Sequence, residues 1–204
     1  MPTSRLEAFS DGVLAIIITI MVLELKVPEG HTFGDFFHTT GSSLLSYLLS
    51  FVYVGIYWNN HHHMFQLVRQ IRGGVLWANL ALLFCLSLFP FTTDWVDETK
   101  FEPTPVVVYG INLLAAAVAY FVLQTLIIRQ QGPESPLRLA IGRDLKGRAS
   151  PVLYLAGILC ALLVDRTGRY GAAIGEGFFV AVAIMWVVPD PRIERAIREH
   201  DLPG

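Results

Sequence analysis

Six long apolar stretches, separated by short charged segments, constrain this chain more than any other feature of its sequence. A helix needs about 20 mostly apolar residues to cross the hydrocarbon core of a bilayer. Each of the six stretches approaches or reaches that length. We therefore expect six membrane-spanning helices, at Glu7–Leu25, Gly41–His61, Gly73–Phe91, Val106–Ile128, Ala149–Val164 and Ala172–Val188.

Composition excludes several other classes of protein. Only 16% of the 204 residues are charged and 53% are apolar, whereas soluble domains carry roughly 25% charged residues. The net charge of −2 provides no basic surface for a nucleic acid, and the two cysteines lie in separate apolar stretches rather than in a disulfide framework. The predicted fold class is an all-α integral membrane protein. Residues 1–204 form a single six-helix domain in the lipid bilayer, with no nucleic-acid partner.

The basic residues predict how the chain is oriented. With both termini cytoplasmic, eleven of the fifteen Lys and Arg residues fall on the inner side and four on the outer side, as the positive-inside rule requires. The acidic segment at 94–98 then lies outside, and residues 191–204 form a short charged cytoplasmic tail. Because no extramembrane segment is long enough for a catalytic domain, we expect the protein to act within the membrane and not as an enzyme.

Asp11 lies within the first span, where a charged group is costly unless it finds a partner or water. It could belong to an ion or proton path, or it could hold the start of the helix in place; we favour the structural role. The end of the second span and the start of the third lie at the same membrane level in this topology. Residues there that are expected to form a polar cluster with Asp11 are Arg5, Ser10, Asn59, Asn79 and one or more of His61, His62 and His63.

The three consecutive histidines do not have the spacing of a metal site. Consecutive helical residues point about 100° apart, and the chain has no HxxxH or HExxH pattern. We expect no metal here, and expect the histidines to hydrogen-bond to the first helix instead. A pH-responsive role stays open, because an unperturbed histidine titrates near pH ~6.5.

One stripe of the first span has helical spacing. Ile16, Thr19, Ile20 and Leu23 stand at i, i+3, i+4 and i+7 and therefore share a face. The stripe could pack against neighbouring helices, which is the commoner use of such a pattern. It could also line a pore whose apolar constriction closes by expelling water. Spacing alone does not decide between the two.

Two features of the later spans are more ambiguous. Glu176, near the outer end of the sixth span, could attract cations or pair with Arg166 or Arg169, but we expect it to face the surface. Gly110 and Asn112 in the fourth span favour close packing of helices.

Four stretches together resemble a known family. The pattern Arg-x-x-x-Phe-Ser-Asp, with Arg5, Phe9, Ser10 and Asp11, opens the first span. It is similar to the signature of the transmembrane protein 175 family, the lysosomal potassium channels of animals and their prokaryotic relatives. Further similar stretches are Tyr57–His63, which includes Trp58, Leu76–Leu80, which includes Trp77, and Ser87–Thr93. Six spans in 204 residues match the size of the prokaryotic members.

The resemblance implies a potassium-favouring cation channel in the plasma (inner) membrane of a prokaryote. Such channels are homotetramers in which the first helices line a central pore, without the familiar potassium-filter loop. This chain has no Thr-Val-Gly-Tyr-Gly string. The resemblance places the narrowest constriction at Ile16, a contribution to selectivity at Thr19, and pore-facing apolar side chains at Ile20 and Leu23. It implies no cofactor beyond the permeant potassium ion.

The resemblance also assigns Phe9, Ser10 and Asp11 to tying the first helix to the second and third. Ala15 departs from animal repeats that carry a serine beside the constriction, so only a modest preference for potassium is expected.

Two other functions remain as alternatives. A proton-coupled secondary transporter would use Asp11 or Glu176, although the chain shows neither an internal repeat nor a proline at the middle of a span. An integral-membrane metalloenzyme would be built on the histidines.

Overall fold

The computed structural model describes residues 3–68, 70–142, 144–164 and 169–187. Its elements are α1 (Thr3–Leu23), α2 (Phe33–Gln66), α3 (Gly73–Ser87), α4 (Phe89–Glu98), α5 (Pro103–Gln131), α6 (Pro136–Ile141), α7 (Leu145–Leu163) and α8 (Arg169–Val187). Apart from the short α6, they form six segments long and apolar enough to cross a membrane, with α3 and α4 sharing one of them. The prediction of an all-α protein with six spans is confirmed. The predicted tail at 191–204 lies outside the described residues.

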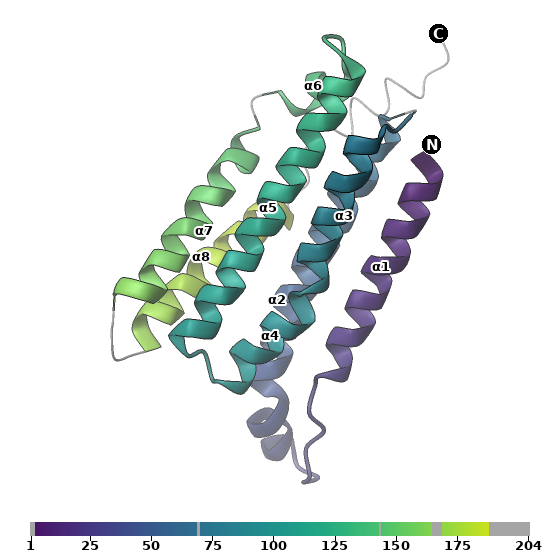
Figure 1. The fold of residues 1–204 in the computed structure, drawn as a ribbon. Coiled ribbons are helices and arrows are strands. Elements are labelled where there is room, and N and C mark those ends of the chain that lie inside the picture. Colours follow the sequence, from purple (N-terminus) through teal and green to yellow (C-terminus); the bar gives the residue numbers. More distant parts are fainter. Residues whose placement is uncertain (1–2, 69, 143, 165–168, 188–204) are drawn as a thin grey trace.

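The spanning segments run antiparallel to their neighbours in sequence, so the start of α1 and the end of α8 lie at the same end of the bundle (Figure 1). α1 lies at the edge of the bundle and packs against α2, α3 and α4. The remaining helices are therefore close to α1 on one side only, which leaves its other side without a neighbouring helix among the described residues.

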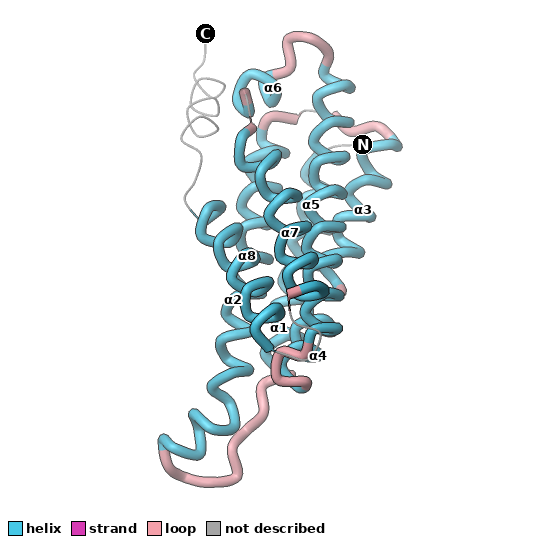
Figure 2. The backbone as a smooth tube through the Cα atoms, turned by 90° about the vertical axis from the view of Figure 1, so that its left-hand side faces the viewer, coloured by secondary structure: helices cyan, strands magenta, loops and turns pink. Residues whose placement is uncertain are grey.

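The helix α2 is much longer than the predicted span at 41–61. It has 34 residues, which at 1.5 Å per residue extend about 50 Å, well beyond the ~30 Å hydrocarbon core. Its first turn is fixed by Thr32, whose hydroxyl accepts from the Asp35 backbone amide at 3.2 Å while the Asp35 carboxylate accepts from the Thr32 amide at 3.0 Å. Figure 2 shows this end of α2 projecting beyond the other helices. Its other end continues to Gln66, so the three histidines lie within the helix.

The third span is interrupted near its middle. α3 ends at Ser87, and α4 begins at Phe89 with Pro90 in its first turn, where the missing proline N–H costs no hydrogen bond. The helix then continues to Glu98, beyond the predicted end at Phe91. Pro90 therefore lies well inside the third span, and the expectation that prolines lie only near span ends is wrong. The acidic segment at 94–98 is therefore helical rather than a loop.

Glycines allow α5, α7 and α8 to pack closely. A Cβ atom at Gly157 would lie 2.6 Å from Cε1 of Phe179 and 3.0 Å from the carbonyl oxygen of Gly175, and one at Gly110 would lie 2.5 Å from Cζ of Phe179. The expectation that Gly110 serves helix packing is confirmed. Small residues at such contacts are typical of membrane helices, whose association depends on close van der Waals packing.

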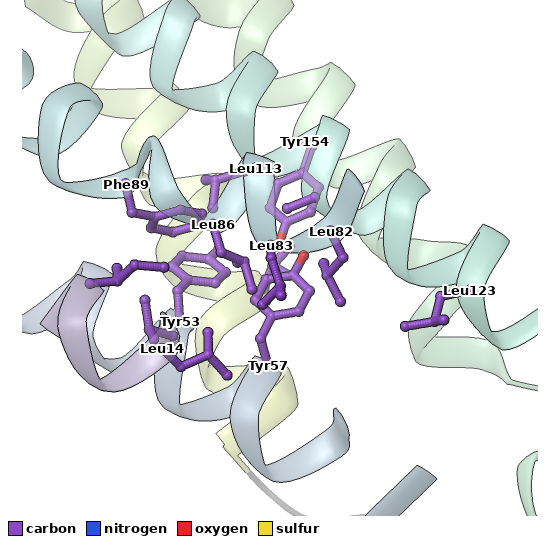
Figure 3. Packing of buried hydrophobic residues seen from close by; sticks show 14 of the residues in the cluster. Leu14, Tyr53, Tyr57, Leu82, Leu83, Leu86, Phe89, Leu113, Leu123 and Tyr154 are labelled. Carbon is purple, nitrogen blue, oxygen red and sulfur yellow. The ribbon is translucent and has the colours of Figure 1, made fainter. Parts of the chain in front are cut away.

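An aromatic cluster fills the centre of the bundle (Figure 3). Tyr53 of α2 and Phe89 of α4 are almost completely buried and lie side by side. The Tyr53 hydroxyl donates to the carbonyl oxygen of Phe179 at 2.5 Å, which satisfies the one polar group that this side chain brings into the core. The cluster therefore joins α2 and α4 to α8 through buried side-chain contacts.

Candidate functional site

The helix α1 has two faces of different character. The buried face carries residues three or four positions apart: Leu6, Ser10, Leu14, Ile17 and Met21. The opposite face carries the stripe identified from the sequence. Its side chains are exposed, with Ile16 58% and Leu23 79% accessible in the single chain. One side of α1 is therefore packed into the bundle, and the other is presented outward.

The buried face is anchored by a network of three hydrogen-bonded side chains. The Ser10 hydroxyl donates to the carbonyl oxygen of Leu6 at 2.8 Å, and the Asn79 amide donates to Ser10 Oγ at 3.0 Å. Asn79 Oδ1 lies 2.7 Å from His61 Nε2. Because an amide oxygen only accepts, His61 must donate from Nε2. All three side chains are buried and each has a partner, which is the condition under which a buried polar network stabilises.

A second contact holds Asp11 at the exposed edge of this network. The Trp58 indole nitrogen donates to Asp11 Oδ1 at 3.0 Å, and the Trp58 ring stacks on His62 with 6.1 Å between ring centroids. His62 also lies within hydrogen-bonding distance of Gln66 (3.0 Å) and 3.9 Å from a carboxylate oxygen of Glu7. Together these contacts connect the first three turns of α1 to the last turns of α2.

The structure does not place every expected residue in this cluster. Arg5 lies on the exposed face of α1, because it is five positions before Ser10 and so points away from the buried face. Asn59 lies two positions before His61 and therefore on the other side of α2. Neither residue joins the network among the described residues, so this part of the expected cluster is wrong. Phe9 and Trp77, from the signature stretches, are exposed as well.

The histidine side chains point to different neighbours. His61 faces Asn79, His62 lies beside Gln66, and the His63 ring centroid is 5.9 Å from that of His62. Within the described part of the chain, no group of three or more His, Cys, Asp or Glu residues is arranged to hold a metal ion.

The exposed stripe borders a groove between α1 and α4. The groove has a volume of about 500 Å³, and its lining includes Ile16, Ile20 and Phe91, with the carboxylates of Glu24 and Asp94 also on its wall. On the same face, the Thr19 hydroxyl donates to the carbonyl oxygen of Ile16 at 2.9 Å, so its oxygen lone pairs remain free to accept. The stripe is thus apolar along most of its length, with one hydroxyl and an acidic end.

The acidic end of α4 is tied to the loop between α1 and α2. Lys26 Nζ lies 2.7 Å from Glu98 Oε1, and this hydrogen bond raises the pKa of Lys26 above its ordinary value. Ser43 donates to Asp97 at 2.5 Å, and Thr40 donates to the Lys26 carbonyl at 2.7 Å. These contacts fix the end of α1 that lies opposite the Ser10–Asn79–His61 network.

Glu176 is placed differently from the sequence expectation. It lies within α8, and its Oε1 atom is buried without a hydrogen-bond partner among the described residues. The expectation of a surface-facing glutamate is wrong, because the rotation of α8 turns this side chain toward α2 and α5. The sequence feature that could have indicated a buried position is that this carboxylate lies between two glycines in an apolar span. Arg166 and the Arg169 side chain lie outside the described residues.

Comparisons with known proteins agree with this architecture. Residues 5–90 match the family described as endosomal/lysosomal potassium channel TMEM175. The chain is 48% identical over 200 residues to a potassium channel of Chryseobacterium sp. (strain P1-3), an alignment that covers 98% of this chain and 100% of that protein.

The crystal structure of a lysosomal potassium-selective channel TMEM175 homolog from Chamaesiphon minutus superposes with a TM-score of 0.73 at 28% identity, covering 91% of this chain and 96% of the other. The human endosomal/lysosomal proton channel TMEM175 is 24% identical over 190 residues, which are 91% of this chain but 36% of the human protein. These relatives are named as channels, and the chain spans the full length of the Chryseobacterium protein. This multi-pass membrane protein belongs to the TMEM175 family.

Proposed function

We propose that this protein is a homotetrameric cation channel of a prokaryotic plasma membrane, with a pore lined by the exposed face of α1 that conducts passively and favours potassium over sodium. One observation carries the proposal. The helix that opens with the family signature stands at the edge of the bundle, with Ile16, Thr19, Ile20 and Leu23 on its exposed face. Relatives of the chain carry the name potassium channel.

Assembly around a common axis gives this stripe a function. Four copies with α1 innermost bring four Ile16 side chains together at one level. A narrow ring of such side chains expels water, and an ion cannot shed its hydration shell without a large energetic cost. The ring therefore closes the pore when narrow and conducts a partly hydrated cation when wider.

Thr19 and the acidic end of the groove supply the polar contacts along this path. The Thr19 oxygen accepts no hydrogen bond within its helix and faces outward, so four of them offer acceptors to a cation one turn beyond Ile16. Glu24 and Asp94 make the outer entrance electronegative, which raises the local concentration of cations. With one hydroxyl per chain and Ala15 beside the constriction, the expected preference for potassium is modest.

The Ser10–Asn79–His61 network and the Asp11–Trp58 contact position α1 rather than contact the ion. They hold the buried face of α1 against α2 and α3, so that the stripe is held in a fixed direction. Most of the basic residues flank the spans at this anchored end, which supports a cytoplasmic position for it.

A flux measurement in liposomes tests the proposal. Purified protein should dissipate potassium, sodium and cesium gradients passively, with potassium faster than sodium. Ile16→Asn should raise the basal flux about tenfold or more, since a polar ring stays wet and each 1.4 kcal/mol removed from the barrier gives a factor of ten.

Val22→Asn is the matched control, because Val22 is also exposed but lies about 120° away around α1. Equal effects of the two substitutions would contradict the pore assignment. Flux that appears only with an imposed proton gradient, and is lost in Asp11→Asn or Glu176→Gln, would favour a coupled transporter.

A further inference from the structure

The helix α7 lies at the edge of the bundle opposite α1 and packs against α5 and α8 (Figure 1). Its buried face carries Ser150, Tyr154, Gly157, Ile158 and Ala161. In the tetramer proposed above, with α1 innermost, α7 is on the outside and its other face meets the lipid bilayer. This contact with lipid depends on the arrangement of the subunits and not on ion conduction.

The exposed face of α7 is an apolar stripe that contains one arginine. Arg148 is exposed and lies in the first turns of the helix. Leu145, three positions before it on the same face, is 72% exposed. Four aliphatic side chains continue this face on the other side of Arg148, three or four positions apart and 48–65% exposed: Val152, Leu155, Leu159 and Leu162. The arginine therefore has exposed apolar side chains both before and after it along the helix.

The neighbouring charge on Lys146 is directed elsewhere. Lys146 Nζ lies 6.0 Å from the centre of the Trp186 ring on α8, a distance at which a cation is attracted to the face of the ring. Two positions correspond to about 200° around a helix, so Arg148 lies on nearly the opposite side of α7. Arg148, unlike Lys146, therefore belongs to the lipid-facing stripe.

The position of Arg148 along the span places its charge near the lipid headgroups. α7 begins at Leu145, which is also where the apolar span begins. A charged group in the hydrocarbon core is costly, and a long basic side chain lowers this cost by covering apolar surface with its stem and extending its charged end to the interface. The Arg148 guanidinium is thus expected at the level of the lipid phosphates.

The end of the bundle around Arg148 is positively charged. Residues 129–148 include five basic and two acidic residues. Arg129, at the end of α5, and Arg138, in α6, are both exposed. Of the two acidic residues, Glu134 is exposed, and the Asp144 carboxylate accepts from the Gly147 amide at 2.9 Å. This end therefore attracts anions and favours an anionic headgroup over a zwitterionic one.

We propose that Arg148 binds the phosphate of an anionic phospholipid in the leaflet at this end of the bundle, while the acyl chains of the lipid lie along the stripe that continues from Val152. A guanidinium donates two parallel hydrogen bonds to a phosphate group, which gives the contact a defined geometry. The aliphatic side chains of the stripe then provide the surface against which the chains pack.

Native mass spectrometry of the full chain in detergent tests the proposal independently of ion flux. The probes are dioleoylphosphatidylglycerol, which is anionic, and dioleoylphosphatidylcholine, which has the same chains and is zwitterionic. The anionic lipid should bind more tightly. Arg148→Gln should weaken its binding about fivefold and change that of the zwitterionic lipid much less. Lys146→Gln is the matched control, because it removes the same charge two positions away from a side chain that lies over Trp186.

Three outcomes of this titration would overturn the proposal. Equal binding of the two lipids would show that the stripe contacts lipid without regard to charge. Equal losses in Arg148→Gln and Lys146→Gln would indicate a diffuse positive surface rather than a site. Binding of the anionic lipid that Arg148→Gln leaves unchanged would show that this arginine is engaged elsewhere.

A second measurement locates the acyl chains. In a chain whose Cys85 and Cys160 are replaced by alanine, a fluorine tag is placed through Val152→Cys or through Ile184→Cys, an exposed position near the same end of α8. Nitroxide on the chain of phosphatidylglycerol should broaden the Val152 tag more than nitroxide on phosphatidylcholine does. Arg148→Gln should abolish this excess. An equal excess at Ile184, or none at Val152, would contradict the proposed position of the lipid.

Discussion

The two faces of α1 are both largely apolar, yet they make opposite contacts. The buried face carries Ser10, whose hydroxyl is engaged by Leu6 and Asn79, and the helix packs along it against α2, α3 and α4. The exposed face carries Thr19, whose hydroxyl reaches only its own helix at Ile16. In a membrane, apolarity does not distinguish a packed face from an open one, because lipid chains are as apolar as leucine. The two faces are distinguished by the polar residue that each carries and by the group to which that residue hydrogen-bonds.

The largest expected effect is a difference in the free energy of unfolding between substitutions on the two faces. Leu14→Ala removes a side chain that is 2% exposed in the core, whereas Ile16→Ala removes one that is 58% exposed. We expect Leu14→Ala to lower the free energy of unfolding by about 2–3 kcal/mol, chiefly through lost packing contacts. Ile16→Ala should change it by less than about 0.5 kcal/mol. Unfolding by sodium dodecyl sulfate, followed by circular dichroism in mild detergent, measures both. Similar losses for the two variants would mean that both faces are packed.

A smaller loss is expected from the polar anchor of the buried face. Asn79→Leu leaves the buried His61 side chain without its partner and Ser10 with only its helical contact. An unpaired buried group costs about 1–3 kcal/mol, so we expect a loss of about 2 kcal/mol in the same unfolding assay. Trp77→Leu, at a nearby position of α3 whose side chain is 75% exposed, should cost much less. A stable Asn79→Leu protein would show that the network is not what fixes α1.

The smallest expected effect concerns the hydroxyl on the exposed face. Thr19→Val keeps the shape of the side chain and removes the oxygen that accepts no hydrogen bond in the single chain. Stability should change by less than about 0.5 kcal/mol, while the ratio of potassium to sodium flux in liposomes should move toward one. An unchanged ratio would remove Thr19 from the selectivity of the proposed pore.

The sequence predicts the parts of the fold that depend on local pattern. Six spans follow from hydrophobic length, and the role of Gly110 follows from the need of membrane helices for small residues at close contacts. The pairing of Ser10 with Asn79 and His61 was foreseeable, because antiparallel spans bring these positions to one membrane level.

Features that depend on helix rotation and on loop contacts were not predictable in this way. The start of α2 at Phe33 is fixed by the reciprocal hydrogen bonds of Thr32 and Asp35, which precede the apolar stretch. The position of Glu176 depends on how α8 is turned relative to α2, and no local pattern encodes that angle. Arg5 and Asn59 were expected in the polar cluster from their membrane level alone, but the rotation of α1 and α2 turns both away.

Thiol accessibility in liposomes tests most directly whether the exposed face of α1 lines an ion path. Cys85 and Cys160 are first replaced by alanine, and a single cysteine is then placed at Ile16 or at Val22, which are both exposed but lie about 120° apart on α1. A charged, membrane-impermeant thiol reagent is added while potassium flux is recorded. We expect the reagent to change the flux of Ile16→Cys and leave Val22→Cys unaffected, because only the first would face water in the pore. Modification of Val22→Cys with no reaction at Ile16→Cys would contradict the account, since the pore would then lie along another face.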